Sequence, residues 1–306
     1  PLFHWTHLEL KRYFGIEELL SPNTAEKIYH KCNQRLSEQT HSCQGLLDQM
    51  KVEVVCTTDD PIDDLVFHGT IENPNGQLKV LPTFRPDRVY AIESANYRDY
   101  IKKLEGEVDF EIDSFDKLLQ AAENRIDFFH EAGGRLSDHG FEQLYDVEYS
   151  IHAASKIFSD VRSGRLPCET EKQVFKMTVL VELSKMYHKK GWTQQFHLGA
   201  IRDNNKRLLG KLGPDTGFDS IGDFDQIRGL SRFLKTMDGT DQLAKTILYN
   251  LNPRDNEAFA TMIGNFMDGS IPGKLQYGSG WWFLDQKDGK EKQINALSNM
   301  GLLSQF

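Results

Sequence analysis

The chain of 306 residues is long enough for one large domain or two ordinary ones, and its 39% hydrophobic and 26% charged residues are typical of a globular protein. A net charge of -9 argues against nucleic acid as a partner, yet local cations could still bind an anionic substrate. With no membrane-length apolar run, no secretory signal and no metal-type spacing among four cysteines, we expect a cytoplasmic protein with reduced thiols.

The first fifty residues are predicted to be mainly helical. The stretch TAEKIYHKCNQRL, residues 24–36, carries apolar side chains at helical spacing. His4 and His7 share a face of an earlier helix, but a histidine pair without a supporting carboxylate more often lies on the surface than binds a metal. We therefore divide the chain into a helical segment, residues 1–50, and a second part, residues 51–306.

Two strands are predicted next. VEVVC predicts a strand over residues 52–56, and Asp60 followed by Pro61 has the pattern of a helix N-terminus, with a capping carboxylate and a proline at the first helical position. LKVLPTF predicts a second strand over residues 78–84. Residues 96–113 are a candidate insertion.

The clearest helices are in the middle of the chain. Apolar residues recur at helical spacing over residues 115–129, and Gly133 and Gly134 end that helix. RLSDHG then predicts a short strand. A second long helix is expected to start at a capping Thr170 and to close with lysines and Gly191.

The later strands alternate with helices. QFHLGAIRDNN, AKTILYNL and KLQYGSGWWFLD are predicted to be strands, with a helix near residues 255–267 between the last two. About six strand candidates, most of them alternating with helices, indicate an α/β protein with a parallel sheet and helical crossovers.

Polar and aromatic residues stand at the ends of these strands. In parallel α/β proteins, functional groups gather at the carboxyl ends of the strands. Six such ends favour a barrel over an open sheet, because a barrel directs all its strand ends to one mouth. The residues concerned are Thr57, Thr58, Asp59, Arg85, Asp138, His139, His197, Arg202, Asn250, Asn252, Arg254, Trp281 and Trp282.

A histidine and an aspartate among them are candidates for acid–base chemistry. His197 is either an acid or base at the mouth or an ordinary hydrogen-bonded histidine. Asp138 is either a catalytic carboxylate or a turn residue favoured by Ser137 and Gly140. His139 would point away from Asp138 if the segment is extended.

Two arginines are candidates for binding a carboxylate. Arg202 could grip two oxygens with its planar fork, or it could pair with Asp203 on the surface. Arg85, whose backbone is restricted by the following proline, could supply a second cation, or it could pair with Asp87.

The tryptophan pair is the aromatic candidate. If Trp281 and Trp282 lie on a strand, their side chains face opposite sides, so one would line the mouth while the other packs in the core. Sugar-binding sites often offer a flat aromatic face.

Several long strings of the chain together resemble uronate isomerase (glucuronate isomerase), a family of the amidohydrolase superfamily. They follow the family's order over almost the whole chain: PLFHWTHLELKRYFGI, VVCTTDDP, LPTFRPD, LSDHG, QFHLGAIRDNN, LGPDTGFDSIGD, ILYNLNPRDNE and GSGWWFLDQ. The resemblance implies a (β/α)8 TIM-like barrel of the metal-dependent hydrolase type, here with about six of its eight strands and extra helical segments.

The same resemblance implies an aldose–ketose isomerase, an intramolecular oxidoreductase of bacterial hexuronate catabolism. It would interconvert D-glucuronate with D-fructuronate, and D-galacturonate with D-tagaturonate, by metal-assisted proton transfer through an enediol. The implied catalytic residues are Asp138 and His197, and the implied substrate-binding residues are Arg85, Arg202, Trp281 and Trp282. The implied partners are a small uronate sugar and further copies of the chain in a homo-oligomer, with no nucleic acid and no membrane.

The family's metal motifs do not occur on the corresponding strands of this sequence. The resemblance implies a divalent metal, zinc, held in the full-length family by a His-x-His motif on the first barrel strand and an Asp-x-Arg motif on the last. Because this chain carries neither motif on a corresponding strand, we assign no residue as a metal ligand and expect the chain to resemble the central part of the family. Two alternatives are a metal-dependent hydrolase of the same superfamily and an inactive fragment that lacks the ligands.

Overall fold

The computed structural model describes residues 2–71 and 78–301, and it divides into two compact units. The helical unit comprises Pro1–Cys56 and Thr70–Leu81, and the sheet unit comprises Thr57–Gly69 and Pro82–Phe306. Within the described ranges, no helix is both long and apolar enough to cross a membrane.

The helical unit confirms that the first fifty residues are mainly helical. Its helices and two paired parallel strands are α1 (Leu2–Phe14), α2 (Ala25–Leu36), η1 (Gln39–His41), α3 (Cys43–Gln49), β1 (Val54–Cys56) and β2 (Lys79–Leu81). Its core consists of Leu10, Ile16 and Ile28. His7 serves this fold, because its Nδ1 contacts the carbonyl of Phe3 at 2.7 Å and its Nε2 accepts a hydrogen bond from the Leu20 amide at 2.9 Å.

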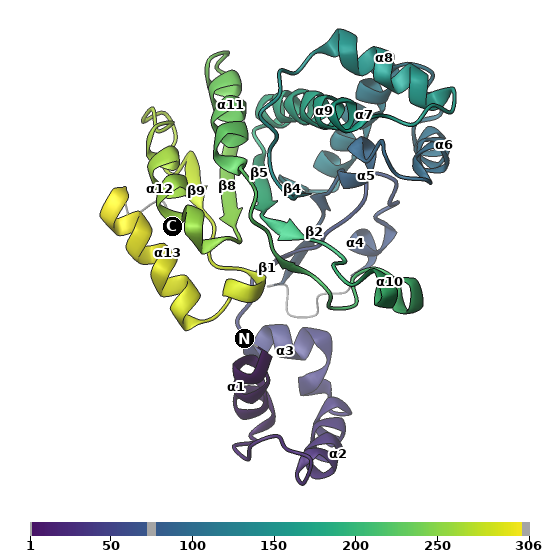
Figure 1. Ribbon diagram of the computed structural model, residues 1–306. Helices are drawn as coiled ribbons and strands as arrows, with labels where there is room; N and C mark the ends of the chain where they lie inside the picture. The colour runs from purple at the N-terminus through teal and green to yellow at the C-terminus, as the bar shows by residue number, and fades with distance from the viewer. Residues whose placement is uncertain (1, 72–77, 302–306) are drawn as a thin grey trace. The chain divides into compact units, whose positions relative to one another are not determined.

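The sheet unit is built on five parallel strands in the order β3-β4-β5-β8-β9 (Figure 1). These strands are β3 (Thr83–Phe84), β4 (Leu136–Phe141), β5 (Thr193–Leu198), β8 (Lys245–Asn250) and β9 (Leu275–Tyr277). A separate antiparallel pair is formed by β6 (Ala200–Ile201) and β7 (Ser220–Ile221). The strands predicted from RLSDHG, QFHLGAIRDNN and AKTILYNL are confirmed.

Helices connect the parallel strands and cover the sheet. The longest are α7 (Phe115–Glu131), which packs on β3, and α9 (Glu169–Lys190), which packs on β5. The others are α4 (Val66–Thr70), α5 (Asp87–Tyr90), α6 (Tyr97–Val108), α8 (Ile151–Arg162), α10 (Lys206–Leu212), α11 (Gln226–Asp238), η2 (Pro253–Asp255), α12 (Asn256–Gly264), η3 (Trp282–Leu284) and α13 (Lys287–Met300). This alternation of parallel strands and helices confirms the barrel-type α/β class.

Aromatic side chains fill the space between the sheet and its helices. Phe84 and Phe129 meet edge to face at 5.1 Å, and Tyr187 stacks on Trp192 at 5.8 Å. All four rings are buried. Each removes a large apolar area from water, a contribution of roughly 1.5–3 kcal/mol per side chain, and so fixes the strands whose ends carry the candidate residues.

Two expectations about the early strands are wrong. Residues 78–84 do not form one strand, because Pro82 lacks the amide that a continuous ladder needs, and β2 and β3 join different sheets. Asp60 does not cap a helix at Pro61. Its Oδ1 accepts from the Ile62 amide at 3.1 Å in a tight turn, and α4 begins only at Val66.

Two later expectations also fail. Helix α9 begins at Glu169, not after Thr170, and the amide of its N-cap residue Cys168 donates to the Glu171 carboxylate at 2.8 Å. The strand predicted to contain the tryptophan pair ends at Tyr277. Trp282 instead opens η3 with a left-handed backbone, φ 54°.

The segment treated as a candidate insertion is largely α6. Its residues Tyr97, Tyr100, Ile101 and Leu104 are buried in the main core of the sheet unit. The assignment of residues 96–113 as an insertion, and of residue 51 as a domain boundary, stays a prediction.

Candidate functional site

Three of the predicted residues meet at the carboxyl ends of β3, β4 and β5. Asp138 lies in β4, His197 lies in β5, and Arg85 follows β3 directly. The parallel register sets Gly140 beside His197, so Asp138 and His197 lie two positions apart along neighbouring strands. Residues two positions apart in a strand share one face, which explains why both side chains reach the same point.

Asp138 is bonded through both carboxylate oxygens. Its Oδ1 lies 2.6 Å from His197 Nδ1, and its Oδ2 accepts a hydrogen bond from Arg85 Nη1 at 3.0 Å. Burial alone would raise the pKa of Asp138, but the His197 hydrogen bond and the charges of His197 and Arg85 lower it below its usual value. An ionised Asp138 therefore orients the imidazole: it accepts from Nδ1–H, and this tautomer leaves Nε2 as an acceptor.

Aromatic rings fix the other faces of His197. Tyr249, on β8, stacks on the imidazole at 4.3 Å between centroids with only 7° between the planes. Trp281 meets it edge to face at 4.7 Å. The Tyr249 hydroxyl donates to Gln195 Oε1 at 3.2 Å, which holds the stacked ring in place. Sequence reasoning missed Tyr249, although the two-residue period of its strand places it on the face opposite the buried Leu248 and Asn250.

Asp87 is a second site residue that sequence reasoning placed only as a pairing partner. Its Oδ2 accepts from Arg85 Nε at 3.0 Å, its Oδ1 accepts from the Tyr90 hydroxyl, and the Gly140 amide lies 3.3 Å from both oxygens. Burial alone would lower the pKa of Arg85, but the carboxylates of Asp87 and Asp138 raise it. A Cβ at Gly140 would come within 2.6 Å of Arg85 Nη2, so a larger residue there would have to displace the guanidinium.

His139 points away from this cluster, as predicted. It is fully buried among aromatic rings, with Phe196 at 5.2 Å and Phe141 at 6.3 Å. Burial lowers its pKa to about 4, so the ring is neutral at ordinary pH. Its nearest polar contact is the Tyr90 hydroxyl, 3.4 Å from Nδ1, and we assign it to the core.

Arg202 forms the second cluster with a partner that the sequence did not indicate. It does not pair with Asp203, since its Nη1 donates to Asp219 Oδ2 at 3.1 Å and lies 3.6 Å from Asp215. The guanidinium lies over the ring of Trp282 at 4.5 Å.

The tryptophan pair connects the two clusters. Trp281 contacts His197, Trp282 contacts Arg202, and the two indole rings lie 5.2 Å apart. The premise that both tryptophans lie on a strand is wrong, because β9 ends at Tyr277 and Trp282 opens η3, and which ring faces the mouth stays a prediction. Both rings lie within one aromatic wall.

Other polar residues at strand ends serve the fold. The Thr57 hydroxyl donates to Asp59 at 2.6 Å and lies 2.7 Å from His68 Nε2. Asn250 is buried, and its side chain bonds to the Gln226 side chain, to the carbonyl of Asn252 before η2 and to the Asn256 side chain in α12. Arg254 forms ion pairs with Asp223 and Asp255.

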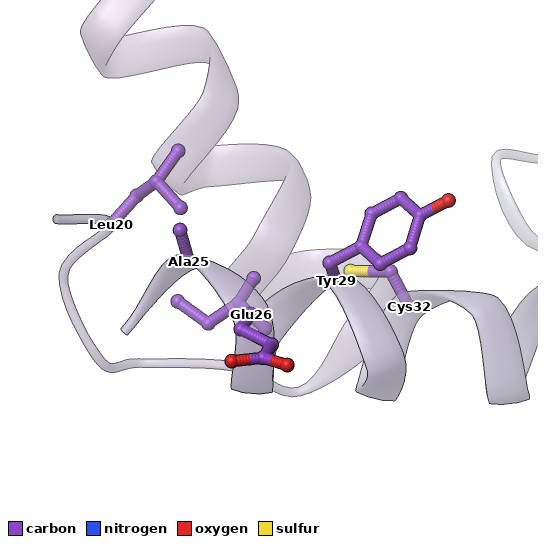
Figure 2. Close-up of a pocket in the computed structure, with 6 residues that line it drawn as sticks. Leu20, Ala25, Glu26, Tyr29 and Cys32 are labelled. Carbon is purple, nitrogen blue, oxygen red and sulfur yellow. The ribbon is translucent and has the colours of Figure 1, made fainter. Parts of the chain in front are cut away.

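The described residues do not fit a metal site. Over residues 2–71 and 78–301, no group of three or more histidine, cysteine, aspartate or glutamate side chains could hold an ion. The nearest candidates, Asp138 and His197, are bonded to each other. A hollow of about 560 Å³ lies in the helical unit and is lined by Leu20, Ala25, Glu26, Ile28, Tyr29 and Cys32 (Figure 2). Its apolar walls contain none of the predicted site residues.

The arrangement suits proton movement on a small anion. A carboxylate–imidazole couple can accept and return a proton near neutral pH. Two arginines supply positive charge, and the tryptophans supply a flat apolar wall. Five strand ends and loops supply these groups. Their combination indicates an active site more specifically than any single group does.

Comparison with known proteins gives consistent matches. The family model described as glucuronate isomerase matches residues 1–306. A uronate isomerase of Bacteroides fragilis is 52% identical over all of this chain and 66% of its own length, and one of Opitutus terrae is 53% identical over 65% of its length. The chain therefore spans slightly less than two thirds of the length of these relatives.

Solved structures agree with this result. The crystal structure of a uronate isomerase from Thermotoga maritima superposes with a TM-score of 0.90 at 31% identity, over 99% of this chain and 65% of that one. A glucuronate isomerase from Caulobacter crescentus gives a TM-score of 0.87 at 24% identity over 98% of this chain and 61% of that one, and supports the fold.

Proposed function

This chain belongs to the glucuronate isomerase family, and we propose that its activity is the aldose–ketose isomerisation of uronates. The proposed reactions interconvert D-glucuronate with D-fructuronate, and D-galacturonate with D-tagaturonate. The observation that carries the proposal is the bonded row of His197, Asp138 and Arg85 at adjoining strand ends. The names of the relatives support the choice of uronates as the substrate class.

Isomerisation moves a carbonyl between C1 and C2 of the open-chain sugar. A proton leaves C2, an enediol forms, and a proton returns at C1, while a further proton moves between the two oxygens. We assign these transfers to the couple of Asp138 and His197, with Nε2 of the imidazole facing the substrate and Asp138 holding the ring in one tautomer. Because both Asp138 oxygens are bonded, Asp138 acts through His197.

The two arginines divide the substrate's negative charge between them in this proposal. Arg85, beside Asp138, stabilises charge that develops on the enediolate oxygens. Arg202, over Trp282, binds the carboxylate at the far end of the sugar. Trp281 and Trp282 provide the flat wall against which the sugar lies, and they keep water from the reacting carbons.

A divalent metal is implied by the family resemblance, with zinc as the expected ion. The described residues provide no ligand set that fits it, so no step of this mechanism depends on the metal. The cytoplasmic location and the homo-oligomer likewise stay predictions from the sequence.

The function is tested by incubating the protein, as its gene encodes it, with D-glucuronate. We expect a ketose of unchanged mass, and in deuterated water the product should gain deuterium at the carbon that receives the proton. Proton NMR and mass spectrometry would follow both. A product that has gained the mass of water would indicate a hydrolase instead, and an unchanged sugar would contradict the proposal.

A further inference from the structure

The guanidinium of Arg202 is held on two sides by its own chain. Its Nη1 donates to Asp219 Oδ2 at 3.1 Å, and its plane lies over the Trp282 ring at 4.5 Å. Asp219 is the buried member of this pair, with a side chain 6% exposed against 43% for Arg202. A carboxylate that is buried while its arginine partner is accessible can hold the guanidinium in place, whereas an ion pair between two exposed side chains contributes little.

The antiparallel pair β6 and β7 explains why Asp219 lies opposite Arg202. Its register pairs Ala200 with Ile221 and Ile201 with Ser220, so the next position along each strand pairs Arg202 with Asp219. Opposite residues of an antiparallel pair lie within side-chain reach. The Asp203 amide also donates to Asp219 Oδ1 at 2.8 Å, so both carboxylate oxygens are engaged and the side chain has one orientation.

The support from Trp282 depends on an uncommon backbone. Trp282 has φ 54°, a left-handed conformation that bulky residues rarely adopt. Its ring also stacks on Phe283 at 5.3 Å and 6° between planes, which keeps its flat face turned to the guanidinium. Non-glycine residues held in this region cluster at functional sites, where the surrounding structure offsets the strain.

The remaining edge of Arg202 is available. Within the described residues, no hydrogen bond involves its Nε or Nη2, and the carboxylates of Asp215 and Asp219 both approach Nη1. The Nε–Nη2 edge matches the two oxygens of a carboxylate. An arginine fixed at Nη1 and across one face can bind such a group with little further loss of side-chain entropy.

We propose that Asp219 is the positioning residue that makes Arg202 selective for the carboxylate of an acidic sugar. The inference rests on the proposed function, and it adds that selectivity for acidic over neutral sugars depends on a residue that touches no substrate. Removal of the Asp219 charge should let the guanidinium turn, so binding of the acid group weakens while the distant carbon chemistry continues.

The test compares Asp219→Asn with Asp215→Asn in the protein as its gene encodes it. Asp215 is the matched control, because its carboxylate lies 3.6 Å from the same Nη1 but is 83% exposed. For D-glucuronate we expect Asp219→Asn to raise KM about tenfold with kcat changed less than about twofold, and Asp215→Asn to leave both unchanged. In Asp219→Asn, inhibition by an acidic sugar should weaken by the same factor of about ten, while inhibition by the neutral amide of that sugar should not change.

A double-mutant cycle separates positioning from a general structural role. In an Arg202→Gln background, Asp219→Asn should add no further rise in KM, because the group it positions is gone. An equal rise in both backgrounds, or tighter substrate binding by Asp219→Asn, would overturn the inference. If wild-type protein does not isomerise uronates, the proposed function fails and not only this inference.

A structure of the native protein with D-glucuronate bound covers the case in which Asp219→Asn does not fold. We expect the Arg202–Asp219 hydrogen bond to persist and the sugar carboxylate to contact Nε and Nη2. A carboxylate found in place of Asp219 on Nη1 would show that Asp219 competes with the substrate and would overturn the inference.

Discussion

At the scale of single residues, Asp138 is the group whose role depends most on its charge. It accepts from both His197 and Arg85, and an asparagine of the same shape can accept on only one side. Its amide would then face a second donor, and the imidazole would adopt the other tautomer or turn away. The proposed chemistry should be more sensitive to this change than substrate binding.

We therefore expect Asp138→Asn to lower kcat for D-glucuronate by about 100-fold or more, with KM changed only a few-fold. Steady-state kinetics would measure both constants. Glu123→Gln is a suitable control, because Glu123 pairs with Lys189 on the exposed surface of the sheet unit. Near-normal turnover in Asp138→Asn would remove Asp138 from proton transfer.

His139, the next residue, leads to a prediction about stability and pH and not about catalysis. Its pKa in the folded protein is about 4, against an ordinary value of 6.5, so the unfolded chain binds the extra proton more readily between these pH values. The free energy of unfolding should therefore fall as pH falls from 6.5 to 4, by up to about 3 kcal/mol from this residue.

The test variant is His139→Phe, which keeps a flat ring among Phe141 and Phe196 and loses only the 3.4 Å contact with Tyr90. Urea unfolding at several pH values should give a shallower dependence between pH 4 and 6.5 than in the wild-type protein. A slope equal to that of the wild type would assign the acid sensitivity to other groups.

At the scale of elements, helix α11 shows how one close approach can outweigh helix propensity. A Cβ on Gly229 would lie 1.7 Å from the carbonyl oxygen of Leu144, in the segment after β4. Gly106, inside α6, has no atom within 4 Å of the same position. The two glycines therefore differ in surroundings but not in helical setting.

Alanine substitutions at these glycines should have opposite effects. Gly229→Ala is expected to destabilise the protein by about 2–4 kcal/mol, because the helix must move away from the main chain it contacts. Gly106→Ala should stabilise it by about 0.5–1 kcal/mol through helix propensity alone. Urea denaturation would measure both, and a stabilising Gly229→Ala would show that α11 can shift freely.

Local pattern was enough to predict the elements that carry His197 and Asp138. Burial is nearly continuous along β4 and alternates along β5, where Phe196 and Leu198 are buried. The alternation of strands and helices along the chain then predicts that the two strands are parallel neighbours. The meeting of Asp138 with His197 was therefore foreseeable in outline. The break at Pro82 and the turn at Asp60 were misread although each has a local cause, because Pro82 lacks a ladder amide and Asp60 accepts from the Ile62 amide.

The second cluster could not be predicted in the same way. β6 and β7 are two residues long, which is too short to show a period, and the residues between them have no pattern that sets their register. Asp219 thus had no local signal that links it to Arg202. Trp282 was assigned to a strand because aromatic residues favour strands, whereas its left-handed backbone is set by contacts elsewhere in the chain.

At the scale of the whole molecule, the two units differ in the size of their cores. Leu10, Ile16 and Ile28 are the buried apolar residues at the centre of the helical unit, with Phe14 and Cys32 beside them. The sheet unit instead has one large aromatic and aliphatic core that joins its strands and helices. Burial at roughly 1.5–3 kcal/mol per side chain leaves a core of three residues little surplus over the entropy of ordering its helices.

We therefore expect the helical unit to open at a lower free energy than the sheet that carries the site. Ile28→Ala, which removes a side chain 4% exposed, should cost about 2–5 kcal/mol and accelerate amide exchange in α1 and α2. Exchange in β4 and β5 should not change. Hydrogen–deuterium exchange with mass spectrometry would measure all four elements in one protein.

A reciprocal variant makes the comparison decisive. Leu248→Ala removes a fully buried side chain from β8, beside the strand of His197, and should accelerate exchange in β5 without a matching change in α2. If either variant accelerated exchange equally in α2 and β5, the two units would form one cooperative structure. Separate responses would mean that the rigidity of the Asp138–His197 couple comes from the sheet unit's own core, because only substitutions in that core would reach it.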